Sequence, residues 1–139
     1  MEEVLEMTRL RIDYIAFVLA LLSTPIVLAA DCRNPQNQTE MNQCAAQDLE
    51  QVTKEINKLY TEYRGRLNEP QKQQLKEIQL AWIKFRDLAC KFDSSGVAGG
   101  SAYPFVMQSC LIEKTRVRLK ELQTLANCQE GDLSCPAWK

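Results

Sequence analysis

The sequence predicts an all-α fold, an elongated antiparallel three-helix bundle stapled by disulfides. Three amphipathic segments with helical periodicity, two short connections between them and six cysteines support this prediction. Short connections favour antiparallel neighbours. A segment of about 28 residues forms a helix roughly 42 Å long, so the core of such a bundle is thin. We expect cross-links to compensate for the thin core, because each one limits the unfolded ensemble and contributes about 2–4 kcal/mol.

The N-terminal segment, residues 1–30, is typical of a cleaved signal peptide. Arg9 and Arg11 precede an apolar run over residues 14–28, and the small pair Ala29 and Ala30 follows it. The leading six residues are acidic and unlike the start of a signal peptide, so Met7 is an alternative start. A retained membrane anchor is the competing interpretation. The run is short for a span of about 20 residues, and we expect no stable membrane span after cleavage.

Cleavage leaves one helical domain, residues 31–139, with a net charge of about +1. No basic excess points to nucleic acid. Asp31 stands between Ala30 and Cys32, which argues against a lipidated cysteine at the cleavage site. All six cysteines follow Ala30, and cysteines in that position favour an oxidising compartment. We therefore expect a periplasmic or secreted protein.

The first helix is predicted to begin at Thr39, a good N-cap, with Glu40 in the first turn. Its apolar positions recur every three or four residues, which is a helical period rather than a strand period. These positions are Met41, Ala45, Leu49, Val52, Ile56, Leu59, Tyr63 and Leu67.

The second helix is predicted to follow Asn68 as its cap, with Pro70 tolerated in the first turn. Its apolar stripe alternates in steps of three and four, close to a heptad pattern. The residues of this stripe, which we expect to face the core, are Leu75, Ile78, Trp82, Phe85, Ala89 and Phe92.

A loop over residues 93–103 and a third helix from Pro104 to about Ala126 complete the bundle. The loop is the only stretch of the chain that is rich in glycine and serine. The inner face of the third helix is predicted to contain Met107, Leu111, Thr115, Leu119, Leu122 and Ala126.

The helix layout narrows the 15 pairings that six cysteines allow. It favours Cys32–Cys44 at the start of the first helix, Cys90–Cys110 across the long loop, and Cys128–Cys135 in the C-terminal tail. In the main alternative, Cys32 or Cys44 pairs with the tail. A zinc site is disfavoured, because the chain has no CxxC spacing and no histidine.

The chain contains no histidine at all, which removes many enzyme classes. Ser-His and Cys-His nucleophile pairs and imidazole metal ligands are excluded. No phosphate-binding glycine motif is present, and the carboxylates suggest no acid/base pair. We expect a binding protein without catalytic residues, cofactor or metal.

Two groups of residues are candidates for contact with a protein partner. Trp82 and Arg86 lie on one flank of the second helix, and these residue types dominate binding hot spots. A packed arginine over the Trp82 ring that fixes helix register is the structural interpretation. The other group is Gly99, Gly100, Ser101 and Tyr103, in a loop that is either a plain connector or a recognition loop held by rigid helices.

Taken together, the sequence motifs of this chain resemble those of the bacterial LprI-like family, also called domain of unknown function 1311. The resemblance runs in order over about residues 31–125, nearly the whole mature chain. It is carried by Cys32, Thr39 to Cys44, Asn57, Tyr60, Gln79, Trp82, Phe85 to Asp87, Cys90, Gly99 to Ser101, Cys110, Leu111, Thr115 and Arg118. The chain departs from the pattern at Ile56, where leucine is commoner, and in the tail pair Cys128 and Cys135.

The family takes its name from a mycobacterial lipoprotein reported to inhibit lysozyme. The resemblance therefore implies a periplasmic or secreted helical protein that inhibits a lysozyme, although we expect no lipid anchor on this chain. If it inhibits, we expect the loop of Gly99, Gly100, Ser101 and Tyr103 to enter the glycan cleft, with Ser101 donating to cleft carboxylates. The alternative is a structural or chaperone-like cell-envelope module that docks another component without inhibiting lysozyme.

Overall fold

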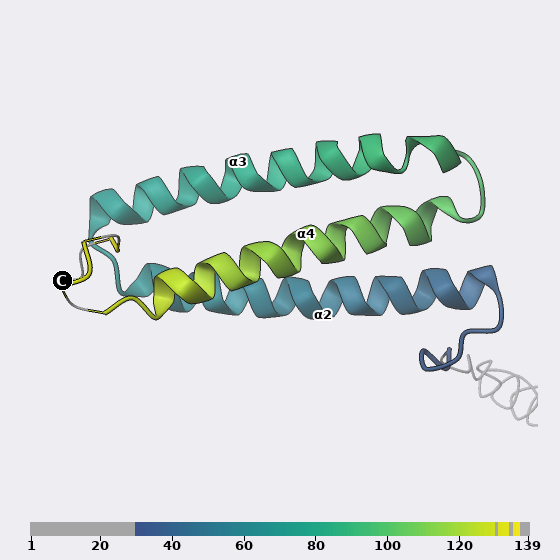
Figure 1. The fold of residues 1–139 in the computed structure, drawn as a ribbon, viewed down its shortest axis with the longest axis horizontal. Helices are drawn as coiled ribbons and strands as arrows, with labels where there is room; N and C mark the ends of the chain where they lie inside the picture. Colours follow the sequence, from purple (N-terminus) through teal and green to yellow (C-terminus); the bar gives the residue numbers. More distant parts are fainter. Residues whose placement is uncertain (1–29, 130, 134, 137–139) are drawn as a thin grey trace, which may run out of the picture.

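The fold is a bundle of three long helices, seen in a computed structural model that describes residues 30–129, 131–133, 135 and 136. The helices are α2 (Gln38–Gly65), α3 (Glu69–Asp93) and α4 (Tyr103–Ala126), with a short 3₁₀ helix, η1 (Ser95–Val97), between α3 and α4. They run antiparallel along the long axis of the molecule (Figure 1). The all-α bundle with three disulfides is thus confirmed.

The expected signal peptide, apart from Ala30, lies outside the described residues. Within the described part of the chain, no helix combines the length and the apolar character needed to cross a membrane.

The helix starts are set by asparagine caps. Asn37, and not the expected Thr39, caps α2: its side-chain oxygen accepts a hydrogen bond from the backbone N–H of Glu40 at 2.9 Å. Asparagine and threonine are both good caps. The helix begins after the earlier of the two, where the carboxylate of Glu40 also accepts a hydrogen bond from the N–H of Gln36. The cap of α3 is Asn68, as predicted, and it forms a reciprocal capping box with Gln71.

Helix α4 packs along both other helices, whereas α2 and α3 contact each other only sparsely. The main apolar core lies toward the end of the bundle where α2 turns into α3, and we call this the core end. It consists of Ile56, Tyr63, Leu67, Leu75, Leu122 and Ala126. The predicted inner stripe of α2 is confirmed here, since Ile56, Tyr63 and Leu67 are all buried.

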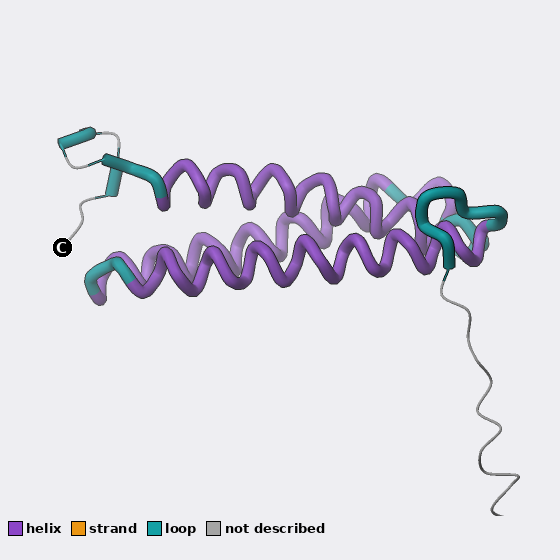
Figure 2. The backbone as a smooth tube through the Cα atoms, turned by 90° about the horizontal axis from the view of Figure 1, so that it is seen from below, coloured by secondary structure: helices purple, strands orange, loops and turns teal. Residues whose placement is uncertain are grey.

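The opposite end, which we call the loop end, holds the N-terminal arm, the start of α2 and the α3–α4 loop (Figures 1 and 2). Its interior is less apolar, because the residues buried there are Ala45, Cys90 and Ser94, and the buried Thr115 follows near the middle of α4. Two disulfides lie at this end, Cys32–Cys44 and Cys90–Cys110, and Cys128–Cys135 closes the tail at the core end. All three pairs are those that the helix layout favours.

The predicted inner stripe of α3 is wrong in half of its members. Ile78, Phe85 and Phe92 are 53%, 64% and 79% exposed, and Trp82 and Leu75 are the large apolar side chains that pack inward. Together with Ala81 and Leu88, which are also exposed, they form a continuous apolar strip that we call the outer stripe. Helix α3 therefore has two adjacent apolar faces, and only one of them meets α4.

A polar layer explains which face of α3 turns inward. The buried side chain of Arg118 on α4 donates from Nε to Gln79 Oε1 at 3.3 Å. The guanidinium of Arg86 donates to Thr115 Oγ1 on α4, also at 3.3 Å. Buried polar groups require such partners, and only the Gln79–Arg86 face of α3 supplies them. Packing of the outer stripe against α4 instead would leave Arg118 only its contact with Glu121, and Thr115 only its hydrogen bond to the Leu111 carbonyl, both within α4.

Candidate functional site

The candidate site is the loop between α3 and α4, and it is an ordered turn. Asp93 still belongs to α3, Ser95–Val97 form η1, and Tyr103 is the first residue of α4 rather than the last of the loop. Backbone hydrogen bonds hold the intervening residues: the N–H of Gly100 donates to the carbonyl of Val97 at 3.0 Å, and that of Tyr103 to Gly100 at 3.1 Å. The loop thus has a defined shape of its own.

Two cross-connections fix this loop to the bundle. The Cys90–Cys110 disulfide joins the last turns of α3 to the early part of α4, and the Cα atoms of the two residues are 5.6 Å apart. On the other side, Asn42 of α2 donates from its amide nitrogen to the backbone carbonyl of Ser101 at 3.0 Å. All three helices therefore hold the loop in position.

Glycine is needed at two points of this turn. Gly99 has a φ of +78°, a left-handed backbone conformation in which residues other than glycine are strained. A Cβ on Gly100 would lie 3.2 Å from the carbonyl oxygen of Val97, which is tighter than ordinary contact. By contrast, Gly96 has open space around it and no positive φ.

The loop presents hydrogen-bond donors without acceptors of their own. Ser101 is exposed, and within the described part of the chain neither its hydroxyl nor its backbone N–H donates to a protein group. The backbone N–H of Gly99 is unpaired among the described residues in the same way. Donors held in a fixed geometry favour an anionic or carbonyl acceptor on a partner.

Trp82 and Arg86, the other candidate pair, lie away from this loop on the inner face of α3. The guanidinium carbon of Arg86 stands 5.1 Å from the centroid of the Trp82 ring, as the structural interpretation expects. Its carboxylate partner is Asp87 on the same helix, at 2.7 Å, rather than an acid on a neighbouring helix. The structure does not bring this pair together with Gly99, Gly100, Ser101 and Tyr103.

Perturbed titrating groups lie away from the loop. Burial raises the pKa of the Tyr63 phenol at the core end, and the nearby charge of Arg66 opposes this shift. A hydrogen bond from Lys54 lowers the pKa of the exposed Glu50 carboxyl on α2. In the described residues, no group of three acidic or cysteine side chains is placed to hold a metal ion.

A shallow groove of about 480 Å³ lies where α2 and α3 stand apart. It is lined by Asn57, Tyr60, Arg64, Lys76, Gln79, Leu80 and Ile83. It contains no carboxylate, and it lies on the side of α3 that faces α2 rather than at the loop.

Sequence reasoning missed Asn42 as a residue of the site. Its position in the run from Thr39 to Cys44 is a motif of the resemblance, but the contact with Ser101 spans 59 residues of sequence. Periodicity within one helix carries no information on such a contact. One feature of the sequence could have indicated this contact. Asn42 carries an amide side chain in the first turns of α2, at the end of the bundle where the loop must also lie.

Comparisons with known proteins give one family. A family model described as lysozyme inhibitor LprI matches residues 30–122. An uncharacterized protein of Rhizobium meliloti (strain 1021) is 33% identical over 114 residues, which cover 73% of this chain and 82% of that protein. No solved structure matches the chain. The matched range contains all three helices up to Leu122 and the whole loop, and it ends before Cys128.

Proposed function

Because this chain belongs to the LprI lysozyme inhibitor family, we propose that it is a periplasmic or secreted binding protein that inhibits a lysozyme. The family match over residues 30–122 carries this proposal. The three disulfides support the extracytoplasmic location, since they persist in oxidising compartments. In this proposal the chain acts by binding and has no catalytic residues of its own.

In this proposal, the loop end is the surface that enters the active site of the lysozyme. Lysozyme and related enzymes cleave glycans with a pair of carboxyl groups on either side of the scissile bond. The Ser101 hydroxyl and the N–H groups of Gly99 and Ser101 are donors of the type that carboxylates accept. Inserted between those carboxyl groups, the loop would occupy the position of the glycan and form charge-assisted hydrogen bonds.

Rigidity of the loop favours tight binding. A loop that is already held in its bound shape loses less conformational entropy when it meets a partner. Here the Cys90–Cys110 disulfide and the Asn42–Ser101 hydrogen bond fix the loop before binding.

The proposal is tested by titrating lysozyme activity on a cell-wall suspension with the oxidised protein. We expect stoichiometric loss of activity with at least one lysozyme type. Ser101→Ala is expected to weaken inhibition roughly 10- to 150-fold, since a hydrogen bond to a charged group contributes roughly 1.5–3 kcal/mol. Ser95→Ala, an exposed serine in η1 of the same loop, is the matched control and should inhibit normally.

A glycine pair tests the loop shape independently of its side chains. Gly99→Ala should weaken inhibition because it strains the left-handed turn, while Gly96→Ala should not, because open space surrounds that position. Equal inhibition by all four variants would remove the loop from the contact. Absence of inhibition by the wild-type protein against several lysozyme types would remove the proposed function itself.

The alternative function is a cell-envelope module that docks another component through a helical face. The outer stripe on α3 is the observation that favours it, because broad exposed apolar surface marks interaction sites. Trp82 and Arg86 give it no support, since they face inward and are engaged with each other and with α4. The two functions differ in the variants that abolish them, Ser101→Ala for inhibition and substitutions in the outer stripe for docking.

A further inference from the structure

The outer stripe of α3 has the pattern of a coiled-coil seam, and among the described residues no other helix covers it. Ile78, Phe85 and Phe92 repeat every seven residues, and Ala81 and Leu88 lie three residues after the first two. These are the a and d positions of two heptads. Leu88 is 59% exposed, as its neighbours in the stripe are, so α4 does not cover the seam.

We propose that this seam binds the same seam of a second copy of the chain, with the two α3 helices antiparallel. This inference does not rest on the proposed inhibition of lysozyme. The charges that border the stripe identify the partner of the seam. The charges of two copies complement each other only when one of the two helices is reversed.

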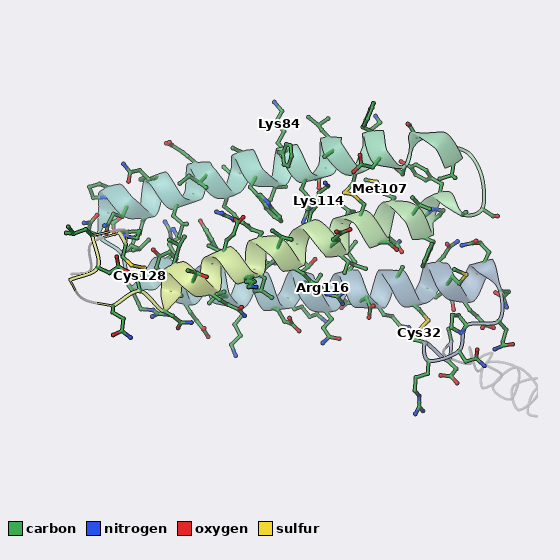
Figure 3. The ribbon with its side chains drawn as sticks, in the orientation of Figure 1. Cys32, Lys84, Met107, Lys114, Arg116 and Cys128 are labelled. Carbon is green, nitrogen blue, oxygen red and sulfur yellow. A yellow bond between two sulfur atoms is a disulfide. The ribbon has the colours of Figure 1, made fainter. Side chains whose placement is uncertain are left out.

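The charged border of the stripe is formed by its g positions, Glu77, Lys84 and Lys91. All three are exposed, and none forms an ion pair with another described residue. Figure 3 shows the Lys84 side chain projecting from the side of α3 that faces away from α4. The other border, at the e positions Trp82 and Ala89, turns toward the bundle and has no charge to offer.

Antiparallel pairing places each g position opposite a g position of the other copy. When Phe85 packs against Ala81 of the second copy, Ile78 packs against its Leu88. Glu77 then lies opposite Lys91, and the two-fold symmetry repeats this ion pair at the other end. The two Lys84 side chains meet near the axis, where long exposed ammonium groups can remain in water.

A parallel pair gives no such match. It would bring g positions against e positions of the second copy, and the e positions lie on the inner face of α3. Glu77 and Lys91 would both be left without partners. The charge pattern therefore selects the antiparallel register of the seam.

The area of the seam indicates a weak dimer. Side chains of this size and exposure offer roughly 400 Å² of apolar surface per copy. A standard contact buries about 800 Å² per partner. We therefore expect a dissociation constant on the order of 100 µM. With such a constant, the dimer forms only where the local concentration of the chain is high.

The test is sedimentation equilibrium at concentrations up to about 1 mM. It uses the oxidised protein in the processed form that the expression host produces. Wild-type protein should dimerise. Phe85→Glu should remain monomeric with an unchanged helical circular dichroism spectrum, because the residue is exposed. Val117→Glu on α4, where the valine is 57% exposed, is the matched control and should dimerise like wild type.

Charge exchange then tests the register. Glu77→Lys and Lys91→Glu should each weaken the dimer about tenfold, because two attractive contacts become repulsive. The double variant Glu77→Lys with Lys91→Glu should restore wild-type affinity. A wild-type chain that stays monomeric throughout, or a dimer insensitive to Phe85→Glu, would overturn the proposal. If the double variant does not recover wild-type dimer affinity, the antiparallel register is wrong. If the wild-type chain stays monomeric and instead binds a different protein through Phe85, the seam has another occupant and the proposed dimer is wrong.

Discussion

The two ends of this bundle are held together by different means. At the core end, Ile56, Tyr63 and Leu122 pack in an apolar core in which Leu122 is fully buried. At the loop end, the small buried residues Ala45 and Ser94 take the place of large apolar side chains, and two disulfides join the elements. A thin bundle buries enough apolar surface to organise one end, and covalent links with polar contacts organise the other.

This difference bears on function. A surface that binds by its shape must stay fixed while remaining exposed, and an apolar core cannot serve there because a core excludes the partner as well as water. Disulfides and hydrogen bonds to the backbone fix a loop without covering it. In this molecule the Cys90–Cys110 bridge and the Asn42–Ser101 hydrogen bond do so for residues 94–102.

Truncation at the core end should have the largest effect on stability. Leu122→Ala is expected to lower the free energy of unfolding by about 3–4 kcal/mol, since it removes a fully buried side chain and leaves a cavity. Phe85→Ala, which removes a larger side chain from the outer stripe, should change it by about 0.5 kcal/mol or less at concentrations where the chain is monomeric. Urea denaturation followed by circular dichroism measures both. Similar losses in the two variants would mean that the outer stripe is part of the core.

Removal of the loop-end bridge should have the next largest effect. Cys90→Ala with Cys110→Ala opens a ring of residues separated by 20 in sequence and is expected to cost about 3 kcal/mol. Cys128→Ala with Cys135→Ala opens a much shorter ring, with a separation of 7, and should cost less. The same denaturation experiment compares the two. A larger loss from the tail pair would contradict the assignment of Cys90–Cys110 as the bridge that organises the loop end.

Alkaline pH should weaken the core end by the smallest of these effects. Burial raises the pKa of Tyr63 in the folded chain above its unfolded value near 10, so the folded state holds this proton more tightly. The stability that comes from this difference is present below the unfolded pKa and is lost as the pH rises through the folded pKa. We expect Tyr63→Phe to flatten the fall in unfolding free energy above about pH 10, with Tyr60→Phe as the control. The chain has no free cysteine to rearrange the disulfides during the measurement. An unchanged pH slope in Tyr63→Phe would show that other groups cause the alkaline loss.

Much of the fold could be predicted from the sequence, because its signals are local. The caps at Asn68 and the breaks near Pro70 and Pro104 place the helix boundaries within a few residues. The favoured cysteine pairs follow from the order of the helices, since each pair closes a connection or a terminal arm.

The orientation of α3 could not be predicted in the same way. Periodicity shows that apolar residues recur at helical spacing, but α3 has two neighbouring apolar stripes with the same spacing. The inward face is the one from which Gln79 and Arg86 form hydrogen bonds with Arg118 and Thr115 of α4, and these contacts between helices are not visible in the pattern of α3 alone. Similarly, the site was predicted as a glycine-rich loop, and its anchor at Asn42 depends on a contact between distant segments that one helix pattern does not contain.

The most direct test of the central claim is a hydrogen–deuterium exchange footprint of the oxidised protein in complex with a lysozyme that it inhibits. If the loop end is the binding end, backbone amides within residues 95–103 should gain protection in the complex, and those of the outer stripe should not. Protection confined to the outer stripe or to the core end, with the loop unchanged, would contradict the account.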